Sequence, residues 1–371
     1  MSNDAPFDPC ASQDVAAYVR EIAGEGPPLV TRIHPADEMY RFELTGHHRT
    51  PETASVFYLS TGASIFRTVS EIAVWRFGGL DHVRSMLDFA AGYGRATRFF
   101  ARALDPYRVT VAEIDPGAVR FQQETFGVHG AVSGHDPRAL PLDGPFDLVL
   151  AVSLFSHLPS GRFEEWLERL LQLVADGGVL VFSTHGPDLL PEGAALPPSG
   201  LVFRPESETP RLAVEEYGTT WVSEEFVRRA AEWLDPSSVR LSTHPRGLAG
   251  YQDVYVVAKA PVPAERLRLA RDPVGTLDRA SIEDGTVRAG GWAAGDRDEP
   301  PPDVRLIFGD RVETVSPGKG PPGSQRRWSF EFPAASVSPD RIIRIEAVSE
   351  RGASKLLVAE KLRPYLPDAA L

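Results

Sequence analysis

Hydrophobic and polar residues follow two different periods along this chain, and the change from one to the other divides it into regions. Between residues 83 and 259, apolar runs with the two-residue period of strands alternate with segments of helical period. The clearest helical stripe follows Ser160 and consists of Phe163, Trp166, Leu167, Leu170, Leu171 and Val174. Strands separated by helices predict an α/β fold, a doubly wound and mostly parallel seven-stranded sheet with helices on both faces.

The two periods also give the expected bounds of the elements. Strands are expected over residues 85–89, 108–113, 146–152, 179–183, 239–243 and 254–259. Helices are expected over residues 95–104, 116–125 and 224–234, and after Ser160, which can cap its helix before Gly177-Gly178 ends it. The proline-rich segment 191–210 is expected to be a surface loop that closes over an acceptor as a lid.

After Pro263 the helical period disappears, and short alternating runs such as Val304–Phe308 and Trp328–Phe332 predict a separate C-terminal β-sandwich. The stiff segment Ala260–Pro263 marks the boundary, so a fragment ending at residue 260 is expected to fold alone. Upstream, helical periods over 15–22 and 65–76 predict an N-terminal helical cap. The expected domains are a cap and substrate segment over 1–80, an α/β domain over 81–260 and a β-sandwich over 264–371.

Charge and cysteine content narrow the classes of partner. The 371 residues include 39 Lys and Arg against 51 Asp and Glu, a net charge of −12, with no basic run. This balance argues against binding to nucleic acid. Neither a signal peptide nor an 18-residue apolar span is evident, and the single cysteine suits a reducing compartment, so we expect no membrane insertion and a cytoplasmic location.

The segment Met86–Arg95 carries the clearest chemical signal, because an apolar strand ends in Asp88 and leads through small residues into a helix. Ala90, Gly92 and Gly94 allow a ligand to approach the backbone closely. About 20 residues later the next strand ends in Glu113, and an acid there suits the two hydroxyl donors of a ribose. The pattern predicts a nucleoside-containing cofactor.

Two cofactors use this geometry, and Asp88 decides between them. A dinucleotide brings a pyrophosphate, which Asp88 would repel, and Thr97 stands where the third glycine of a dinucleotide motif belongs. The amino-acid end of S-adenosylmethionine carries an ammonium group, which Asp88 would attract. A nicotinamide-dependent oxidoreductase is therefore the less favoured alternative.

Asp88-Phe89-Ala90-Ala91-Gly92-Tyr93-Gly94 resembles the first motif of the class I S-adenosylmethionine-dependent methyltransferases, with Ala90 in place of the first glycine. Glu113-Ile114-Asp115-Pro116, Gly134-His135-Asp136 and the segment from Ser153 to Pro159 are similar to later parts of the family pattern. Upstream, Tyr58–Gly62 resembles the segment that closes over the cofactor. The resemblance covers about residues 55–260 and implies S-adenosylmethionine as cofactor. The resemblance implies that S-adenosylmethionine contacts Tyr58, Gly62, Asp88, Ala90, Gly92, Gly94, Arg95, Glu113, Ile114, Asp136 and Ser153.

Two histidines lie where a parallel sheet binds its ligands, just beyond the carboxyl ends of strands. His157 follows the strand 146–152 and His185 follows the strand 179–183. Either is a candidate catalytic base, which a hydroxyl acceptor needs more than an amine does. A packing role for each is the alternative. We see no cluster of metal ligands and expect no metal.

The expected function is metal-independent methyl transfer from S-adenosylmethionine to a small molecule or to a sugar hydroxyl. Trp292 and Trp328 in the β-domain could form an aromatic platform for a carbohydrate, or belong to the sandwich core. The alternative to an enzyme is a non-catalytic S-adenosylmethionine-binding protein whose β-domain recruits a glycan or a partner.

Overall fold

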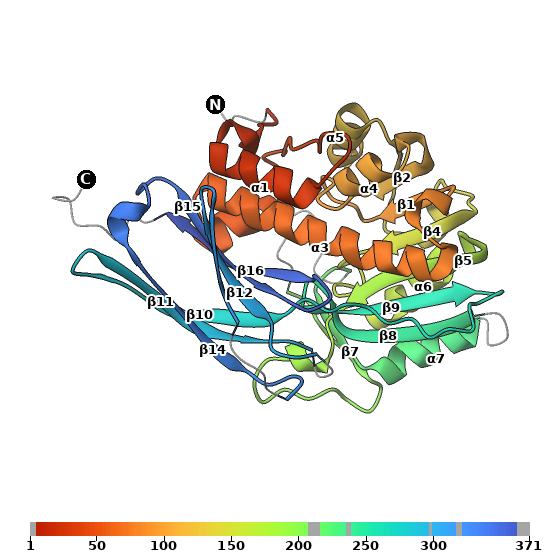
Figure 1. Ribbon diagram of the computed structural model, residues 1–371. Coiled ribbons are helices and arrows are strands. Elements are labelled where there is room, and N and C mark those ends of the chain that lie inside the picture. The colour runs from red at the N-terminus through yellow and green to blue at the C-terminus, as the bar shows by residue number, and fades with distance from the viewer. Residues whose placement is uncertain (1–4, 207–215, 235–238, 297–298, 317–320, 362–371) are drawn as a thin grey trace. The chain divides into compact units, whose positions relative to one another are not determined.

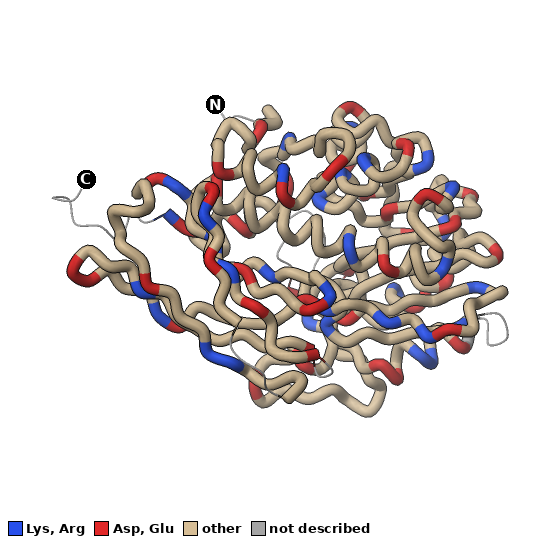
Figure 2. Tube along the Cα trace, in the orientation of Figure 1, with Lys and Arg blue, Asp and Glu red and all other residues tan. Residues whose placement is uncertain are grey.

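The computed structural model describes residues 5–206, 216–234, 239–296, 299–316 and 321–361 (Figure 1). Their contacts divide the chain into two compact units. The first contains residues up to Phe7, Pro27–Glu38 and Ile65–Leu269, and the second contains Asp8–Gly26, Met39–Ser64 and the chain from Ala270. In both units, acidic and basic residues are interspersed along the trace (Figure 2).

The first unit is built on a seven-stranded sheet, which confirms the predicted α/β class. Within the described residues its strand order is β3-β2-β1-β4-β5-β9-β8, and β9 alone runs antiparallel to its neighbours. Its strands are β1 (Met86–Phe89), β2 (Val109–Glu113), β3 (His129–Val132), β4 (Phe146–Ala151), β5 (Val174–Thr184), β8 (Val239–Leu248) and β9 (Gln252–Lys259). The chain builds the sheet outward from β1 to β3 on one side and then from β4 on the other side of β1. Doubly wound sheets bind ligands at this switch point, between β1 and β4.

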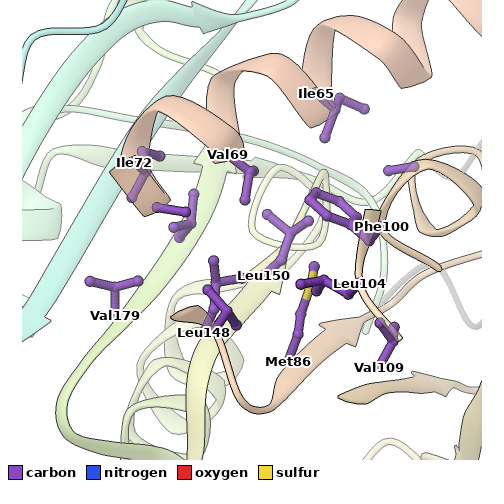
Figure 3. Close-up of a cluster of buried hydrophobic side chains, with 14 of the residues drawn as sticks. Ile65, Val69, Ile72, Met86, Phe100, Leu104, Val109, Leu148, Leu150 and Val179 are labelled. Carbon is purple, nitrogen blue, oxygen red and sulfur yellow. The ribbon is translucent and has the colours of Figure 1, made fainter. Parts of the chain in front are cut away.

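Helices cover both faces of this sheet. They are α4 (Thr97–Ala103), α5 (Pro116–Phe126), α6 (Ser160–Gln172), α7 (Glu224–Leu234) and the second half of α3 (Pro51–Phe77). Figure 3 shows Ile65, Val69 and Ile72 of α3 above Met86, Leu148 and Val179 of the sheet. On the other face, the stripe predicted after Ser160 packs with α7 against β4 and β5. The glycines at 177 and 178 lie inside β5 rather than ending α6, which ends at Gln172.

Segment 191–210 is less irregular than a proline-rich loop suggests. Its described part includes β6 (Leu201–Arg204), which pairs antiparallel with β7 (Thr219–Val222). Pairing with β7 thus gives residues 201–204 of the expected lid a regular structure. Residues 207–210 lie outside the described part of the chain.

The second unit contains two antiparallel sheets, of order β10-β11-β14 and β13-β12-β15-β16. Their strands are β10 (Val274–Glu283), β11 (Thr286–Ala294), β12 (Asp303–Phe308), β13 (Arg311–Val315), β14 (Arg326–Pro333), β15 (Ile342–Val348) and β16 (Ser354–Lys361). One apolar core joins both sheets, as the predicted sandwich requires, and it contains Trp328. Trp328 is 3% exposed and belongs to the core rather than to a surface platform.

The helices of the N-terminal segment are shared between the two units. α1 (Gln13–Ala23), α2 (Glu38–Arg41), the π-helical turn Phe42–Gly46 and the first half of α3 are grouped with the sandwich, apart from Glu38. The Arg344 guanidinium of β15 lies 4.6 Å from the ring centroid of Tyr18 in α1, and Asp14 accepts a hydrogen bond from the Ile342 amide. The contacts group parts of residues 1–80 with each unit and extend the first unit to Leu269. The domain bounds expected from the sequence, at residue 80 and at residues 260–264, stay a prediction.

Candidate cofactor and acceptor site

The turn after β1 is a left-handed backbone segment that small residues make possible. Ala90, Gly92 and Gly94 have φ values of 56°, 55° and 82°. A side chain at position 94 would place its Cβ 2.4 Å from Cε2 of Phe126, so Gly94 is needed for packing against α5. A Cβ at position 92 would meet no atom within 4 Å. The turn is therefore closed beneath Gly94 and open at Gly92, where a ligand can approach the backbone.

Glu113, at the carboxyl end of β2, accepts hydrogen bonds from three backbone amides, one of which belongs to this turn. Its Oε2 accepts a hydrogen bond from Gly92 N at 2.8 Å, and its Oε1 accepts from Ile114 N at 2.7 Å and Asp115 N at 3.3 Å. Burial raises the pKa of Glu113, while these amides act in the opposite direction. The acid predicted to receive a ribose thus also shapes the glycine-rich turn.

Asp88 lies one residue before the end of β1 and is 3% exposed. Its Oδ2 accepts a hydrogen bond of 2.7 Å from the hydroxyl of Thr97, the residue that replaces a dinucleotide-type glycine. Burial raises the pKa of Asp88 to about 7, with a smaller contribution from the nearby charge of Glu113. A cation reaching Asp88 would offset the cost of burying the charge and would favour the ionised carboxylate.

Gln122 of α5, which lies outside the motif pattern, and Asp115 at the N-terminus of α5, which lies within it, both support the turn. Gln122, fully buried, donates from Nε2 to Gly92 O at 2.8 Å. Tyr93 donates to Asp115 Oδ2 at 2.9 Å, and Asp115 Oδ1 caps α5 by accepting from Gly117 N at 2.7 Å. Gln122 stands 30 positions from Gly92 in the sequence, so its role emerges only from the fold.

The remaining predicted cofactor residues occupy different positions around this turn. Ile114 follows Glu113 and is half-buried, as is Arg95, which lies in the turn two residues before α4 begins. Asp136 is exposed and accepts a hydrogen bond of 2.9 Å from Arg138 N in the 3-10 turn that follows β3. Their contacts with the cofactor remain predictions.

Tyr58 and Gly62 are not grouped with these residues, because both lie in the half of α3 that belongs to the second unit. Tyr58 is fully buried, and its ring faces Tyr40 edge-on at a centroid distance of 6.0 Å. Their proposed part in closing over the cofactor stays a prediction.

The two predicted histidines meet beyond the carboxyl ends of β4 and β5. Their ring centroids are 6.1 Å apart. His157 Nδ1 lies 2.7 Å from Gly218 O, and Tyr217 stacks on the His157 ring with centroids 4.6 Å apart. His185 has Trp221 and Tyr251 as aromatic neighbours at 6.1 and 5.8 Å. Two imidazoles surrounded by aromatic rings are suited to remove a proton from an organic molecule that is to receive the methyl group.

Ser153, another predicted cofactor residue, belongs to this histidine region through a hydrogen-bond network. Its φ of 61° places it in the left-handed region immediately after β4. Its hydroxyl donates to Gln252 Oε1 at 3.1 Å, and its amide donates to Ser183 Oγ at 2.8 Å. Gln252, at the start of β9, was not predicted, because only the pairing of β9 with β5 brings it here.

No group of three or more His, Cys, Asp or Glu side chains suited to a metal occurs among the residues that the model describes. The prediction of a metal-independent reaction stays a prediction. Within the same residues, no helix has both the length and the apolar character that crossing a membrane requires.

Comparison with known proteins identifies the domain that contains the turn. A family model described as a methyltransferase domain matches residues 87–180. A probable phthiotriol/phenolphthiotriol dimycocerosates methyltransferase 2 of Mycobacterium ulcerans is 24% identical over 193 residues, which cover 51% of this chain and 64% of that protein. A probable fatty acid methyltransferase of Pseudomonas putida is 30% identical over 105 residues, 27% of this chain and 26% of that protein. The chain thus spans less than two thirds of the length of either relative.

Among solved structures, an S-adenosylmethionine-dependent methyltransferase of Clostridium acetobutylicum aligns with 59% of this chain and 96% of its own, at 12% identity and a TM-score of 0.42. The family match itself runs from β1 into β5 and includes the glycine-rich turn, Glu113 and the segment from Ser153 to Pro159, but not Tyr58–Gly62. It confirms the resemblance seen in the sequence. Residues 87–180 match the methyltransferase-domain family, and they lie on a sheet whose strand order is Rossmann-like.

Proposed function

We propose that the protein transfers a methyl group from S-adenosylmethionine to a hydroxyl group of a small molecule or a sugar, without a metal ion. The observation that carries this proposal is the pair His157 and His185, 6.1 Å apart at the sheet edge that also holds the glycine-rich turn. A hydroxyl is a weak nucleophile until a base takes its proton, whereas an amine is not. Two imidazoles at this place favour a hydroxyl acceptor.

The cofactor-binding residues fit the methyl donor. Gly92 leaves its side of the turn open, Glu113 offers carboxylate oxygens to a ribose, and Asp88 offers a partner for an ammonium group. When bound, S-adenosylmethionine supplies an electrophilic methyl carbon. The chain's own contribution is to hold the acceptor oxygen in line with that carbon and to remove its proton through a histidine.

The names of the two relatives support a small-molecule acceptor over a macromolecule. One is named for phthiotriol and phenolphthiotriol dimycocerosates and the other for fatty acids. The rings of Tyr217, Trp221 and Tyr251 near the histidines would offer apolar surface to an organic acceptor of this kind.

Calorimetry on the full chain tests the cofactor part of the proposal. S-adenosylmethionine is expected to bind and NADH is not. Glu113→Gln removes the charge facing Gly92 and is expected to weaken S-adenosylmethionine binding by about ten- to a hundredfold, the value of a charge-assisted hydrogen bond. Glu124→Gln, at an exposed position of α5, is the matched control and should leave the affinity unchanged.

Transfer of a labelled methyl group to a panel of alcohols, sugars, amines and fatty acids tests the catalytic part. We expect product with a hydroxyl acceptor and a rate that falls at low pH, as a histidine base becomes protonated. Tight binding of S-adenosylmethionine without methylation of any acceptor class in the panel would support a non-catalytic binding protein instead. Preferred methylation of amines would remove the reason for the histidine base.

A further inference from the structure

Gln252 connects three segments of the chain at the edge of the sheet where the histidines meet. Its Oε1 lies 2.7 Å from Ser183 Oγ on β5 and 3.1 Å from Ser153 Oγ after β4. Its Nε2 lies 3.3 Å from His185 Nε2 and 3.5 Å from Ser156 Oγ. The side chain is 7% exposed. A buried amide with all of these partners is held in one orientation.

The hydrogen-bond chemistry of the neighbours assigns the two ends of the amide. The Ser156 hydroxyl donates its hydrogen to Ser153 O at 2.7 Å, so its oxygen accepts from the Gln252 atom that faces it, which must be the amide nitrogen. The other atom is the carbonyl oxygen, which accepts from the hydroxyls of Ser153 and Ser183. The amide nitrogen therefore faces His185 and can only donate. His185 Nε2 must accept this hydrogen bond with its lone pair, which places the ring hydrogen of neutral His185 on Nδ1.

The same reasoning gives a different role to the other histidine. His157 Nδ1 lies 2.7 Å from the carbonyl oxygen of Gly218, which can only accept, so this nitrogen carries a hydrogen. The lone pair of neutral His157 is then on Nε2. The two imidazoles are therefore not equivalent, because the lone pair of one is directed at Gln252.

We propose that Gln252 is a positioning residue that holds His185 neutral, with its Nε2 lone pair engaged, so that His157 receives the proton of the acceptor. This assignment rests on the proposed methyl transfer to a hydroxyl, which it deepens. Protonation of His185 would place a hydrogen on Nε2 against the Gln252 amide and would lose this hydrogen bond. A second positive charge beside a protonated His157 would also be unfavourable at 6.1 Å.

The groups around His185 agree with a neutral ring. Burial lowers the pKa of His185 to about 4, the charge of His157 adds to this effect, and the Thr220 backbone opposes it. Tyr251 and Trp221 border the ring, and Tyr217 lies beyond His157. Asp253, the next residue on β9, has its Oδ1 occupied by the Arg246 amide at 2.8 Å. Among these neighbours, Gln252 is the one whose exchange for an acid would supply a charge directly at Nε2.

Nuclear magnetic resonance of the full-length protein labelled with ¹⁵N-histidine tests the assignment without any acceptor. In the wild type, His185 is expected to be protonated on Nδ1 alone at pH 7 and to remain neutral down to about pH 5. Gln252→Glu places a carboxylate at Nε2 and is expected to raise the titration midpoint of His185 by more than one pH unit, a change of more than tenfold in proton affinity. Gln123→Glu, an exposed glutamine of α5, is the matched control and should leave the midpoint unchanged.

Ser183→Ala is the second variant, because it removes one hydroxyl from Gln252 Oε1 with little change in shape. It should allow the amide to turn and should shift the His185 nitrogen signals towards a mixture of tautomers. A wild-type His185 protonated on Nε2, or a His185 midpoint that is the same in Gln252→Glu, would overturn the proposal. These results do not depend on turnover, so failure to find a methyl acceptor would count against the proposed function and not against this role of Gln252.

Discussion

Exchanging Asp88 for asparagine should stabilise the ligand-free protein while weakening its binding of S-adenosylmethionine. Burial raises the pKa of Asp88 from 3.8 to about 7. At about 1.36 kcal/mol per unit, the charged form costs the folded state about 4 kcal/mol once it is fully ionised. Asparagine keeps an acceptor for the hydrogen bond from Thr97 and carries no charge.

The pH dependence follows from the direction of this shift. Because the folded pKa lies above the unfolded one, the folded protein binds more protons between pH 4 and 7, and stability falls as pH rises through this window. The free energy of unfolding of Asp88→Asn, relative to wild type, should increase by about 2–3 kcal/mol between pH 5 and pH 8.5. Urea unfolding followed by tryptophan fluorescence at the two pH values measures this difference.

A control at the surface separates this effect from a general response to lost charge. Asp105→Asn changes an exposed residue that caps a 3-10 turn, and asparagine caps as well as aspartate. Its effect should stay within about 0.5 kcal/mol at both pH values. A variant Asp88→Asn that is less stable than wild type at pH 8.5, or whose advantage does not grow with pH, would refute the reasoning.

Two further changes test the packing of the turn and the division of the chain. Gly94→Ala should destabilise the protein by about 2 kcal/mol or more, since it combines a positive φ with a clash against Phe126, whereas Gly134→Ala, with open space around it, should have little effect in the same thermal unfolding assay. A fragment ending at Leu269 should aggregate or bind a hydrophobic dye, because it lacks the strands that cover α1. A monomeric fragment that binds S-adenosylmethionine as the full chain does would contradict this grouping.

Residues whose neighbours are close in sequence were the ones that could be predicted. The stripe from Phe163 to Leu171 forms one face of α6, and the strands β1, β2 and β4 lie within a residue or two of their expected bounds. β3 was missed because its four residues at the sheet edge are exposed or half-buried and carry no apolar alternation. The long helix α3 was found only from Ile65 on, where its apolar face meets the sheet.

Residues whose role depends on sheet order could not be found from the sequence. Gln252 stands more than 60 residues from Ser183 and His185, and only the antiparallel pairing of β9 with β5 brings the three together. The grouping of α1 with the sandwich has the same cause, since Asp14 and Ile342 are 328 positions apart. The linker composition around residue 261 gave no sign of these contacts.

The hydrogen bonds of Glu113 set a limit on how much of a ribose it can hold. A carboxylate offers about four lone-pair positions, two on each oxygen. Ile114 N and Asp115 N occupy both positions on Oε1, and Gly92 N occupies one on Oε2. One position is therefore left for a diol that brings two hydroxyl donors. A ribose can place its second hydroxyl on Glu113 only by displacing an amide, so a donor analogue lacking one of the two ribose hydroxyls should lose little of its affinity for this carboxylate.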